Sequence, residues 1–353
     1  MSAPPANRRR LFLDRGIGES RAVVTLDGQP ERLIIRRDSD PASTLLGARS
    51  VARIGRVHRA VNAAYLVLEG GGEAFLQLGP ELPKFAEGQL IDIEIRGEPR
   101  RGKSAIARFL GMGEGSPRLL QAAPSLEEEL AHFGGEGTKI VEGLGARETA
   151  DEAESEILEP VHDLPGGGTI AIEPTRALTA IDVDLGDRPG GDAKRATRAA
   201  NLAALTEAAR LLRLKGLGGL IIFDLAGRGH DGAALLAAAR IAFGPDNPGV
   251  AIGAISRFGT MELTVPRRRA PVLDLLRGPD GGLSALAGAQ RLARALEREG
   301  RAAPGSRLEA ICSPAVAEAF KSLTAGLADR LGARFSVTAQ AGMANGKLEV
   351  AAR

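Results

Sequence analysis

The sequence contains little sulfur and few aromatic rings. Its 353 residues include one cysteine, Cys312, one tyrosine, no tryptophan and four scattered histidines. A single cysteine excludes a disulfide framework and any multi-cysteine zinc site, and the histidines supply no ligand cluster in its place. We therefore expect no structural zinc, a packed rather than reactive Cys312, and a reducing compartment, the cytoplasm, as the location.

Long hydrophobic runs and an excess of one charge are also missing. No apolar stretch approaches the roughly 20 residues that a membrane span requires, and the start MSAPPANRRR lacks the apolar core of a signal peptide. The 46 basic and 44 acidic residues give a formal net charge of +2, which is too small to indicate nucleic-acid binding by itself. We expect no membrane partner, and an interface for RNA or DNA has to be predicted from local features.

Short strand patterns fill the first third of the chain. Residues 11–37 predict two or three strands, with Asp27-Gly28 as the turn of a hairpin. Residues 50–111 contain about five further short strands separated by turn signals, a pattern typical of a small barrel of the OB type. Two helices are expected after the barrel, at 125–133 and 148–161.

Strand and helix patterns alternate in the second half. Residues 166–186 predict a hairpin that turns at Pro174, followed by a helix over 201–214 with one apolar stripe. A buried strand, a second helix and a further strand complete an α/β unit near Gly259. The remainder predicts a linker rich in Gly and Pro and then a small β-α-β region.

Acidic side chains stand at the ends of two predicted strands. Residues alternate across the strand TAIDVDL, so Asp182 and Asp184 share one face while the apolar residues share the other. Asp224 ends the next apolar run, at the carboxyl end of a predicted central strand, where open α/β sheets place their sites. If the two strands are neighbours, the three carboxylates converge and two or three of them suffice for Mg²⁺. From the spacing alone, an interpretation without a metal is equally favoured. In that interpretation Asp182 and Asp184 form the solvent-exposed face of a hairpin, and Asp224 caps the next loop.

A phosphate-binding motif is matched by spacing in the barrel segment. Gly97 and the run Gly102-Lys103-Ser104 fit the pattern G-x-x-x-x-G-K-S, with the strand ending at Asp224 as a candidate partner. A P-loop has to follow a strand buried on both faces and open a helix. The preceding strand instead alternates apolar and acidic residues, and the following segment is short. We favour a basic turn of the barrel and keep a P-loop NTPase as a minor alternative.

Two of the few aromatic residues fall on successive strands of the predicted barrel. Tyr65 and Phe75 lie ten residues apart across a Gly-rich turn, and pairing of the strands would bring both rings onto one face. Unpaired bases stack on such rings, and nearby basic residues such as Lys103 could contact phosphates. The alternative is that both rings belong to the barrel core.

These segments, in this order, resemble the catalytic half of the ribonuclease E/G family of bacterial endoribonucleases. The strongest similarity is GGGTIAIEPTRALTAIDVD, followed by NLAALTEAARLLRLKGLGGLIIFDL and ISRFG. The text IGRVHRAVNAAYLVLEGGGEAFLQL resembles the RNA-binding OB-fold of the family. The resemblance implies an α/β multi-subdomain fold: a reduced RNase H-like subdomain at 9–48 and 114–164, an inserted OB-fold at 49–113, a DNase I-like catalytic subdomain at 165–265, and a linker with a small β-α-β region at 266–353.

The resemblance also implies roles for the acidic and aromatic residues. Asp182 and Asp224 match the two aspartates that bind the catalytic magnesium, and Asp184, which we count as a third metal ligand, stands where the family usually has asparagine. Four positions match RNA contacts of the family: the stacking rings Tyr65 and Phe75, the basic Lys103, and Arg188, the only basic residue kept in the shortened loop LGDRPGGD.

Two further features of the family are missing. The two-cysteine zinc motif expected after ISRFG is absent, so no zinc-linked dimer is expected, while a homo-oligomer without zinc stays open. The segment before GGGT has no counterpart of the arginine-threonine pair that senses a 5′-monophosphate end. We therefore predict a cytoplasmic, magnesium-dependent endoribonuclease for single-stranded RNA. The alternative is an RNA-binding protein of the same fold that has lost useful catalysis.

Overall fold

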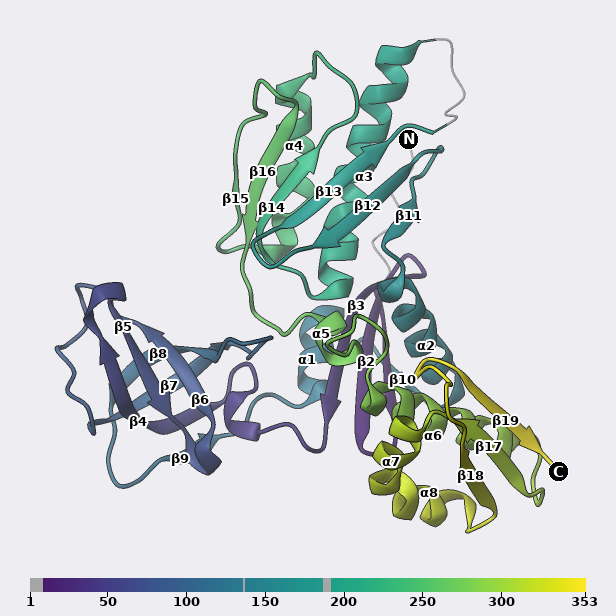
Figure 1. Ribbon diagram of the computed structural model, residues 1–353. Coiled ribbons are helices and arrows are strands. Elements are labelled where there is room, and N and C mark those ends of the chain that lie inside the picture. The colour runs from purple at the N-terminus through teal and green to yellow at the C-terminus, as the bar shows by residue number, and fades with distance from the viewer. Residues whose placement is uncertain (1–8, 136, 187–191) are drawn as a thin grey trace.

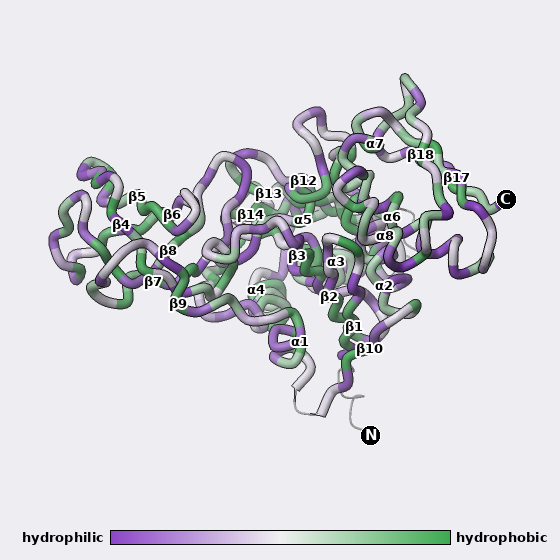
Figure 2. The backbone as a smooth tube through the Cα atoms, turned by 90° about the horizontal axis from the view of Figure 1, so that it is seen from below, coloured by the Kyte–Doolittle hydropathy of each residue, from purple (hydrophilic) through white to green (hydrophobic). Residues whose placement is uncertain are grey.

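The computed structural model describes residues 9–135, 137–186 and 192–353. Its strands form four separate sheets, and the helices pack beside three of them. Figures 1 and 2 show a small barrel at one end of the molecule and the C-terminal unit at the other, with the N-terminal sheet between them, and in Figure 1 the six-stranded sheet stands above these three parts. Within the described residues, no helix combines the length and the apolar character that a membrane crossing requires.

The N-terminal sheet is the predicted meander with one added strand. Its strands are β1 (Arg9–Arg15), β2 (Glu19–Leu26), β3 (Gln29–Arg37) and β10 (Ile140–Glu142), in the order β10-β1-β2-β3, with β10 parallel to β1. Asp27 and Gly28 have φ angles of 51° and 88°, so the hairpin turn predicted there is confirmed. The helices α1 (Leu126–Gly134) and α2 (Leu144–Leu158) cover opposite faces of this sheet.

Residues 49–112 form a closed five-stranded barrel. The strands are β4 (Arg49–His58), β5 (Ala63–Val67), β6 (Glu73–Gln77), β7 (Leu90–Gly97) and β8 (Ala105–Met112), and β9 (Arg118–Gln121) joins β4 from outside. The order β5-β6-β8-β7-β4 closes through a β4–β5 pairing, and only β6 and β8 run parallel. This barrel is consistent with the predicted OB-fold.

The largest α/β unit has a six-stranded sheet covered by helices on one face. Its strands are β11 (Val161–Asp163), β12 (Thr169–Pro174), β13 (Thr179–Asp184), β14 (Gly219–Asp224), β15 (Ala251–Ile252) and β16 (Thr260–Val265), in the order β11-β12-β13-β14-β16-β15. The helices α3 (Ala193–Lys215) and α4 (Gly232–Ala242) lie behind the sheet in Figure 1, and the other face is uncovered. The hairpin predicted at Pro174 and the central position of β14 are confirmed.

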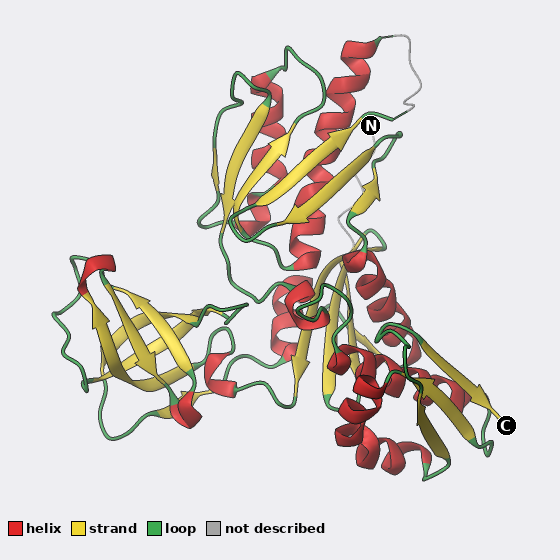
Figure 3. Ribbon diagram, in the orientation of Figure 1, coloured by secondary structure: helices red, strands yellow, loops and turns green. Residues whose placement is uncertain are grey.

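The C-terminal unit is a small three-stranded sheet with helices. It comprises α6 (Ala285–Ala302), β17 (Leu308–Cys312), α7 (Pro314–Phe320), α8 (Thr324–Leu331), β18 (Phe335–Ala339) and β19 (Leu348–Ala352), with strand order β18-β17-β19 (Figure 3). The short helix α5 (Val272–Leu276) precedes this unit and packs beside β3 and α2. Cys312 is fully buried in the core of the C-terminal unit, and burial raises the pKa of its thiol. Cys312 is therefore a packed residue, as predicted.

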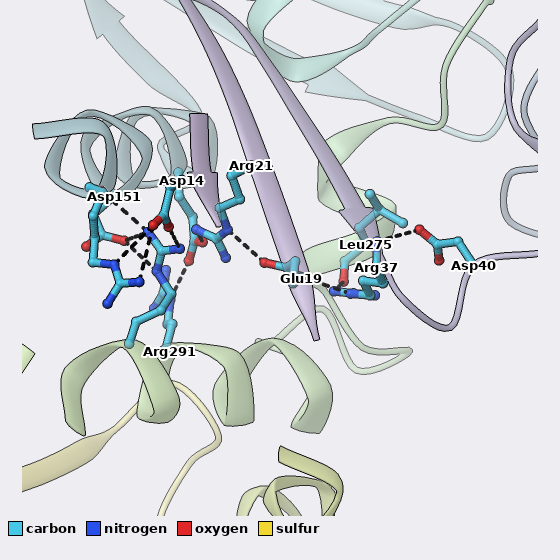
Figure 4. A network of polar contacts seen from close by, with 11 residues as sticks. Asp14, Glu19, Arg21, Arg37, Asp40, Asp151, Leu275 and Arg291 are labelled. Carbon is cyan, nitrogen blue, oxygen red and sulfur yellow. Dashed lines mark hydrogen bonds and ion pairs between the residues drawn. The ribbon is translucent and has the colours of Figure 1, made fainter. Parts of the chain in front are cut away.

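A buried ion-pair network joins the C-terminal helix α6 to the meander and α2 (Figure 4). Arg21 is 1% exposed, its Nε donates to Glu19 at 2.7 Å, and its guanidinium also pairs with Glu154 of α2. Burial alone would lower the pKa of Arg21, but the two carboxylates outweigh burial and raise it. Arg294 of α6 pairs with Asp14 of β1, so α6 is held to the meander by charges that water does not screen.

Candidate functional site

Asp182 and Asp224 are direct neighbours on adjacent parallel strands. The register of β13 and β14 pairs Ile181 with Phe223 and Asp182 with Asp224. Neighbouring strands lie about 4.8 Å apart, and residues in register point to the same face of a sheet. The two carboxylates predicted to share a site therefore leave one sheet face side by side, at the carboxyl end of both strands.

The alternation along β13 and β14 explains why the acids face outward. Ile181, Val183 and Phe223 are buried in the core that the sheet shares with α3 and α4. Asp182 and Asp224 are exposed on the opposite, uncovered face. The predicted division of this strand into an apolar and an acidic face is confirmed.

Among the described residues, the two carboxylates have no ion-pair partner. Neither side chain has a hydrogen bond or ion pair with any residue that the structure describes, although both lie one strand apart and carry the same charge. Such a pair is unfavourable without a cation, and exposed carboxylate oxygens are the ligands that a hard divalent ion prefers. The donor set therefore fits Mg²⁺ with water and substrate phosphate as the remaining ligands.

The third predicted ligand does not complete a cluster. Asp184 is exposed on the same face, but its Oδ1 accepts a hydrogen bond from the backbone N–H of Gly186 at 2.9 Å. In the part of the chain that the structure describes, no group of three or more His, Cys, Asp or Glu side chains is placed to hold a metal ion. The convergence of three acids is therefore not found, and the role of Asp184 stays a prediction. Arg188 lies outside the described residues.

A buried asparagine, which the sequence reasoning missed, holds the loop behind the acid pair. Asn201 of α3 is 1% exposed. Its Nδ2 donates to the carbonyl oxygen of Ala226 at 3.0 Å, and its Oδ1 accepts from the N–H of Ala226 at 3.0 Å. Ala226 follows Asp224 by two residues, so this pair of hydrogen bonds fixes the backbone where β14 ends. A polar residue within the apolar stripe of the predicted helix was the available signal.

The barrel presents both predicted aromatic residues on its outer surface. Tyr65 of β5 and Phe75 of β6 are register partners, with ring centroids 5.7 Å apart in an edge-to-face arrangement. The barrel core is made by their neighbours, such as Leu66 and Leu76. Tyr65 is 38% exposed, Phe75 is half-buried, and neither ring belongs to the barrel core, so the alternative that placed them there is wrong. A shallow pocket of about 320 Å³ next to Tyr65 is lined by Gly55, Arg56, Tyr65, Leu66, Val67 and Glu73.

Lys103 lies in a β-turn and not in a P-loop. It belongs to the connection between β7 and β8, which are antiparallel neighbours, and no helix follows Ser104. The P-loop interpretation is therefore wrong, because that motif requires a parallel strand followed by a helix. Lys103 is exposed and forms no ion pair with a described residue. Two residues after Lys103, Ala105 pairs with Ala74 of β6, so the backbone of Lys103 lies near the strand that carries Phe75.

A basic cluster at residues 267–269 serves contacts between the units. Arg269 pairs with Glu98 at 3.2 Å and also with Glu129 of α1, and Arg267 Nε donates to the carbonyl of Gly218 at 3.0 Å. These arginines join the barrel, α1 and the large sheet around a cavity of about 920 Å³. The charge of Arg269 is partly neutralised by these two carboxylates, whereas the side chain of Arg268 is exposed and, among the described residues, donates only to the carbonyl oxygen of Pro248.

Comparison with known proteins places the acid pair inside the segment that matches a protein family. Residues 118–269 match the Ribonuclease E/G family, which covers less than half of the chain and includes Asp182 and Asp224. The resemblance stated from the sequence is confirmed for this stretch. The five barrel strands, within residues 49–112, precede the matched stretch.

Individual relatives are ribonucleases that are much longer than the matched segment. Ribonuclease E of Haemophilus influenzae is 40% identical over 107 residues, which is 30% of this chain and 11% of the relative. Ribonuclease E of Synechocystis sp. is 34% identical over 147 residues, 41% of this chain and 21% of the relative. Ribonuclease E of Escherichia coli is 40% identical over 107 residues, 30% of this chain and 10% of the relative. The chain thus matches at most about a fifth of the length of these proteins.

Proposed function

We propose that this chain, whose residues 118–269 belong to the Ribonuclease E/G family, is a magnesium-dependent endoribonuclease that cuts single-stranded RNA. The observation that supports this most directly is the register of Asp182 with Asp224 on parallel strands, both exposed and both without a counter-charge among the described residues. The names of the relatives support the reaction class, and the uncovered sheet face gives a polynucleotide room to approach.

The acid pair is proposed to bind the metal through carboxylate oxygens. When bound there, magnesium supplies charge stabilisation at the scissile phosphate and a water of lowered pKa. The protein contributes two side chains held at one strand spacing by the β13–β14 ladder, and Asn201 holds the backbone after Asp224 in place. This chemistry requires no histidine as a general base.

The barrel is proposed to hold the RNA strand that flanks the cut. The exposed ring of Tyr65 and the half-buried ring of Phe75 offer surface on which unpaired bases stack, and Lys103 offers a cation for a neighbouring phosphate. Stacking requires bases whose faces are free, and base pairing in a duplex hides them. This requirement is the reason that we propose single-stranded RNA as the substrate.

The finer assignments of the subdomains belong to the same proposal. We assign the meander with α1 and α2 to an RNase H-like subdomain, the barrel to an RNA-binding OB-fold and the six-stranded sheet to a DNase I-like subdomain. We also propose that the protein acts in the cytoplasm, without structural zinc and without a zinc-linked dimer. Arg188 and Asp184 keep their proposed roles as an RNA contact and as a metal ligand.

The second candidate is an RNA-binding protein without useful catalysis. It is favoured by the absence, among the described residues, of a third ligand close enough to complete a metal-binding group. Both candidates predict RNA binding by the barrel, so only a cleavage assay separates them.

The decisive experiment incubates the purified full chain with a fluorescent single-stranded RNA, with and without Mg²⁺. We expect cleavage only with Mg²⁺, and loss of cleavage with unchanged RNA affinity in Asp182→Asn and in Asp224→Asn. Asp329→Asn is the matched control, because Asp329 is an exposed aspartate of α8, far along the chain from the site. Full activity in both site variants would exclude this site, and no cleavage by the wild-type protein would favour the RNA-binding alternative.

A further inference from the structure

The hairpin between β15 and β16 ends beside the acid pair. Asp224 is the register partner of Thr260, the first residue of β16, and the N–H of Leu225 donates to the carbonyl of Gly259 at 3.3 Å. Two residues before Thr260 lies Phe258, at the tip of this hairpin. One strand spacing and two residues of chain separate Phe258 from Asp224, so their Cα atoms lie within about 12 Å.

The tip is held in one conformation by a single hydroxyl group. The Oγ of Ser256 accepts from the N–H groups of Phe258 at 3.2 Å and Thr260 at 3.3 Å, and it also lies 2.7 Å from the Oγ1 of Thr260. The N–H of Gly259, with a φ of +89°, donates to the carbonyl of Ser256 at 3.1 Å. The two tip residues are therefore presented on a stiff turn rather than on a loose loop.

Both tip side chains are free of the protein. Phe258 is 76% exposed, and the guanidinium of Arg257 lies over its ring, 4.7 Å from the centroid. Arg257 makes no ion pair with a described residue, although two uncompensated carboxylates lie at the same sheet edge. A single exposed apolar side chain is common on protein surfaces. What distinguishes Phe258 is its stiff support, its stacked cation and its position beside the acid pair.

We propose that this tip is a substrate-positioning element: Phe258 stacks on the base of a nucleotide next to the cut, and Arg257 contacts the neighbouring phosphate. The inference rests on the proposed endoribonuclease function and adds a second contact to it, separate from the barrel. Its physical basis is that the acid pair repels the phosphates of an RNA backbone. A cation and a flat apolar ring beside the acid pair offset this repulsion, because the cation attracts a phosphate and the ring stacks on a base. The occupant is therefore an unpaired nucleotide.

Binding tests the proposal without requiring cleavage. The background is the full-length Asp182→Asn, Asp224→Asn protein, which is expected to bind RNA without cutting it. Single-stranded RNAs carry the fluorescent base 2-aminopurine at successive positions, and stacking quenches it. In this background we expect quenching at one or two positions to disappear with Phe258→Ala and to persist with Phe258→Trp. We expect the affinity to fall between about fivefold and about a hundredfold with Phe258→Ala.

The matched control is Ile241→Ala. Ile241 is 79% exposed in the same unit, near the last residue of α4, and that helix begins just after the loop that follows β14. An 11-residue helix is about 16 Å long, which places Ile241 far from the hairpin tip. We expect this variant to keep the quenching pattern and the affinity.

Cleavage in Mg²⁺ by the otherwise wild-type protein gives the second readout. Phe258→Ala should raise KM by a factor similar to its loss of affinity, and removal of the contacted base from the RNA should make wild type and variant equal. An unchanged quenching pattern with Phe258→Ala would overturn the inference, whether or not the protein cleaves RNA. Absence of cleavage by the wild-type protein with the quenching effect intact would overturn the proposed function alone.

Discussion

The side-chain amide of Asn201 holds both backbone groups of Ala226, two residues after Asp224. A buried asparagine on α3 thereby determines where the chain leaves β14. Secondary structure does not satisfy the N–H and C=O of Ala226 at this point, so the loop depends on this one side chain. We therefore treat Asn201 as a positioning residue for the acid pair.

Replacing Asn201 should weaken metal binding as well as stability. In Asn201→Ala two partly buried backbone groups lose their partners, at a cost of about 1 kcal/mol each. We expect half-maximal cleavage to require more Mg²⁺ and kcat to fall while KM for RNA changes little. Asn201→Asp keeps the acceptor for the N–H of Ala226 and should recover part of the effect.

A variant that is merely destabilised provides the control. Leu205→Ala removes a fully buried side chain from the same helix, at a cost of about 2–5 kcal/mol, and Leu205 makes no contact of this kind with the loop. If Leu205→Ala shifts the Mg²⁺ requirement as much as Asn201→Ala, the positioning role is wrong.

Neutralising one member of the acid pair should not destabilise the metal-free protein. Like charges at one strand spacing repel each other by about 1 kcal/mol in a solvent-like environment. We expect Asp182→Asn and Asp224→Asn to keep or slightly raise Tm without metal. Millimolar Mg²⁺ should raise Tm of the wild-type protein, because an ion that binds only the folded state stabilises it.

The measurement is thermal unfolding with and without Mg²⁺. Asp329→Asn should behave as the wild type, since Asp329 lies on the helix α8 and not in the β13–β14 ladder that holds the acid pair. A Mg²⁺-dependent increase in Tm that persists in both site variants would place the ion elsewhere.

Removing the two barrel rings should weaken RNA binding without unfolding the barrel. Tyr65 and Phe75 lie outside the core, so Tyr65→Ala with Phe75→Ala should change Tm little. Each stacked base contributes about 1–3 kcal/mol, and fluorescence anisotropy with single-stranded RNA measures the loss. Phe85→Ala is the control: Phe85 packs against the barrel core and pairs with Phe109 at 5.3 Å, so it should lower Tm and leave affinity unchanged. If the double variant instead lowers Tm and leaves the RNA affinity unchanged, Tyr65 and Phe75 have a structural role.

Local patterns in the sequence were sufficient for most strands and for the acidic face. The alternation around Asp182 decides which side chains are buried, because a sheet with helices on one face has only one apolar side. The same reasoning identified the accidental P-loop spacing at Lys103, since the acidic residues of the preceding strand exclude burial on both faces.

Pairing between distant segments was not predictable from those patterns. The strand β16 was not expected, although Met261 and Leu263 alternate with polar residues, and it supplies the partner of Asp224. The helix α3 begins at Ala193, eight residues before the predicted start at Asn201. The prediction missed these first turns because they are polar and carry no apolar stripe. The arginines at 267–269 could equally have been a solvated surface, and only the folded structure shows their partners in the barrel and α1.

The ion-pair network around Glu154 should make stability depend on acid pH. Burial alone would raise the pKa of Glu154, but Arg21 and Arg291 outweigh burial and lower it below the ordinary value of 4.5. A carboxylate with a lowered folded-state pKa contributes stability above its unfolded pKa, and this contribution is lost as pH falls through the folded value.

In Glu154→Gln, Arg21 keeps its burial and loses one of its two carboxylate partners, a change that costs about 3–5 kcal/mol at neutral pH. Chemical denaturation at successive pH values should show the difference between wild type and Glu154→Gln shrinking below about pH 4.5, while Glu152→Gln, an exposed change on the same helix, follows the wild type throughout. A difference that stays constant down to the acid transition would mean that Glu154 acts through packing rather than through its charge.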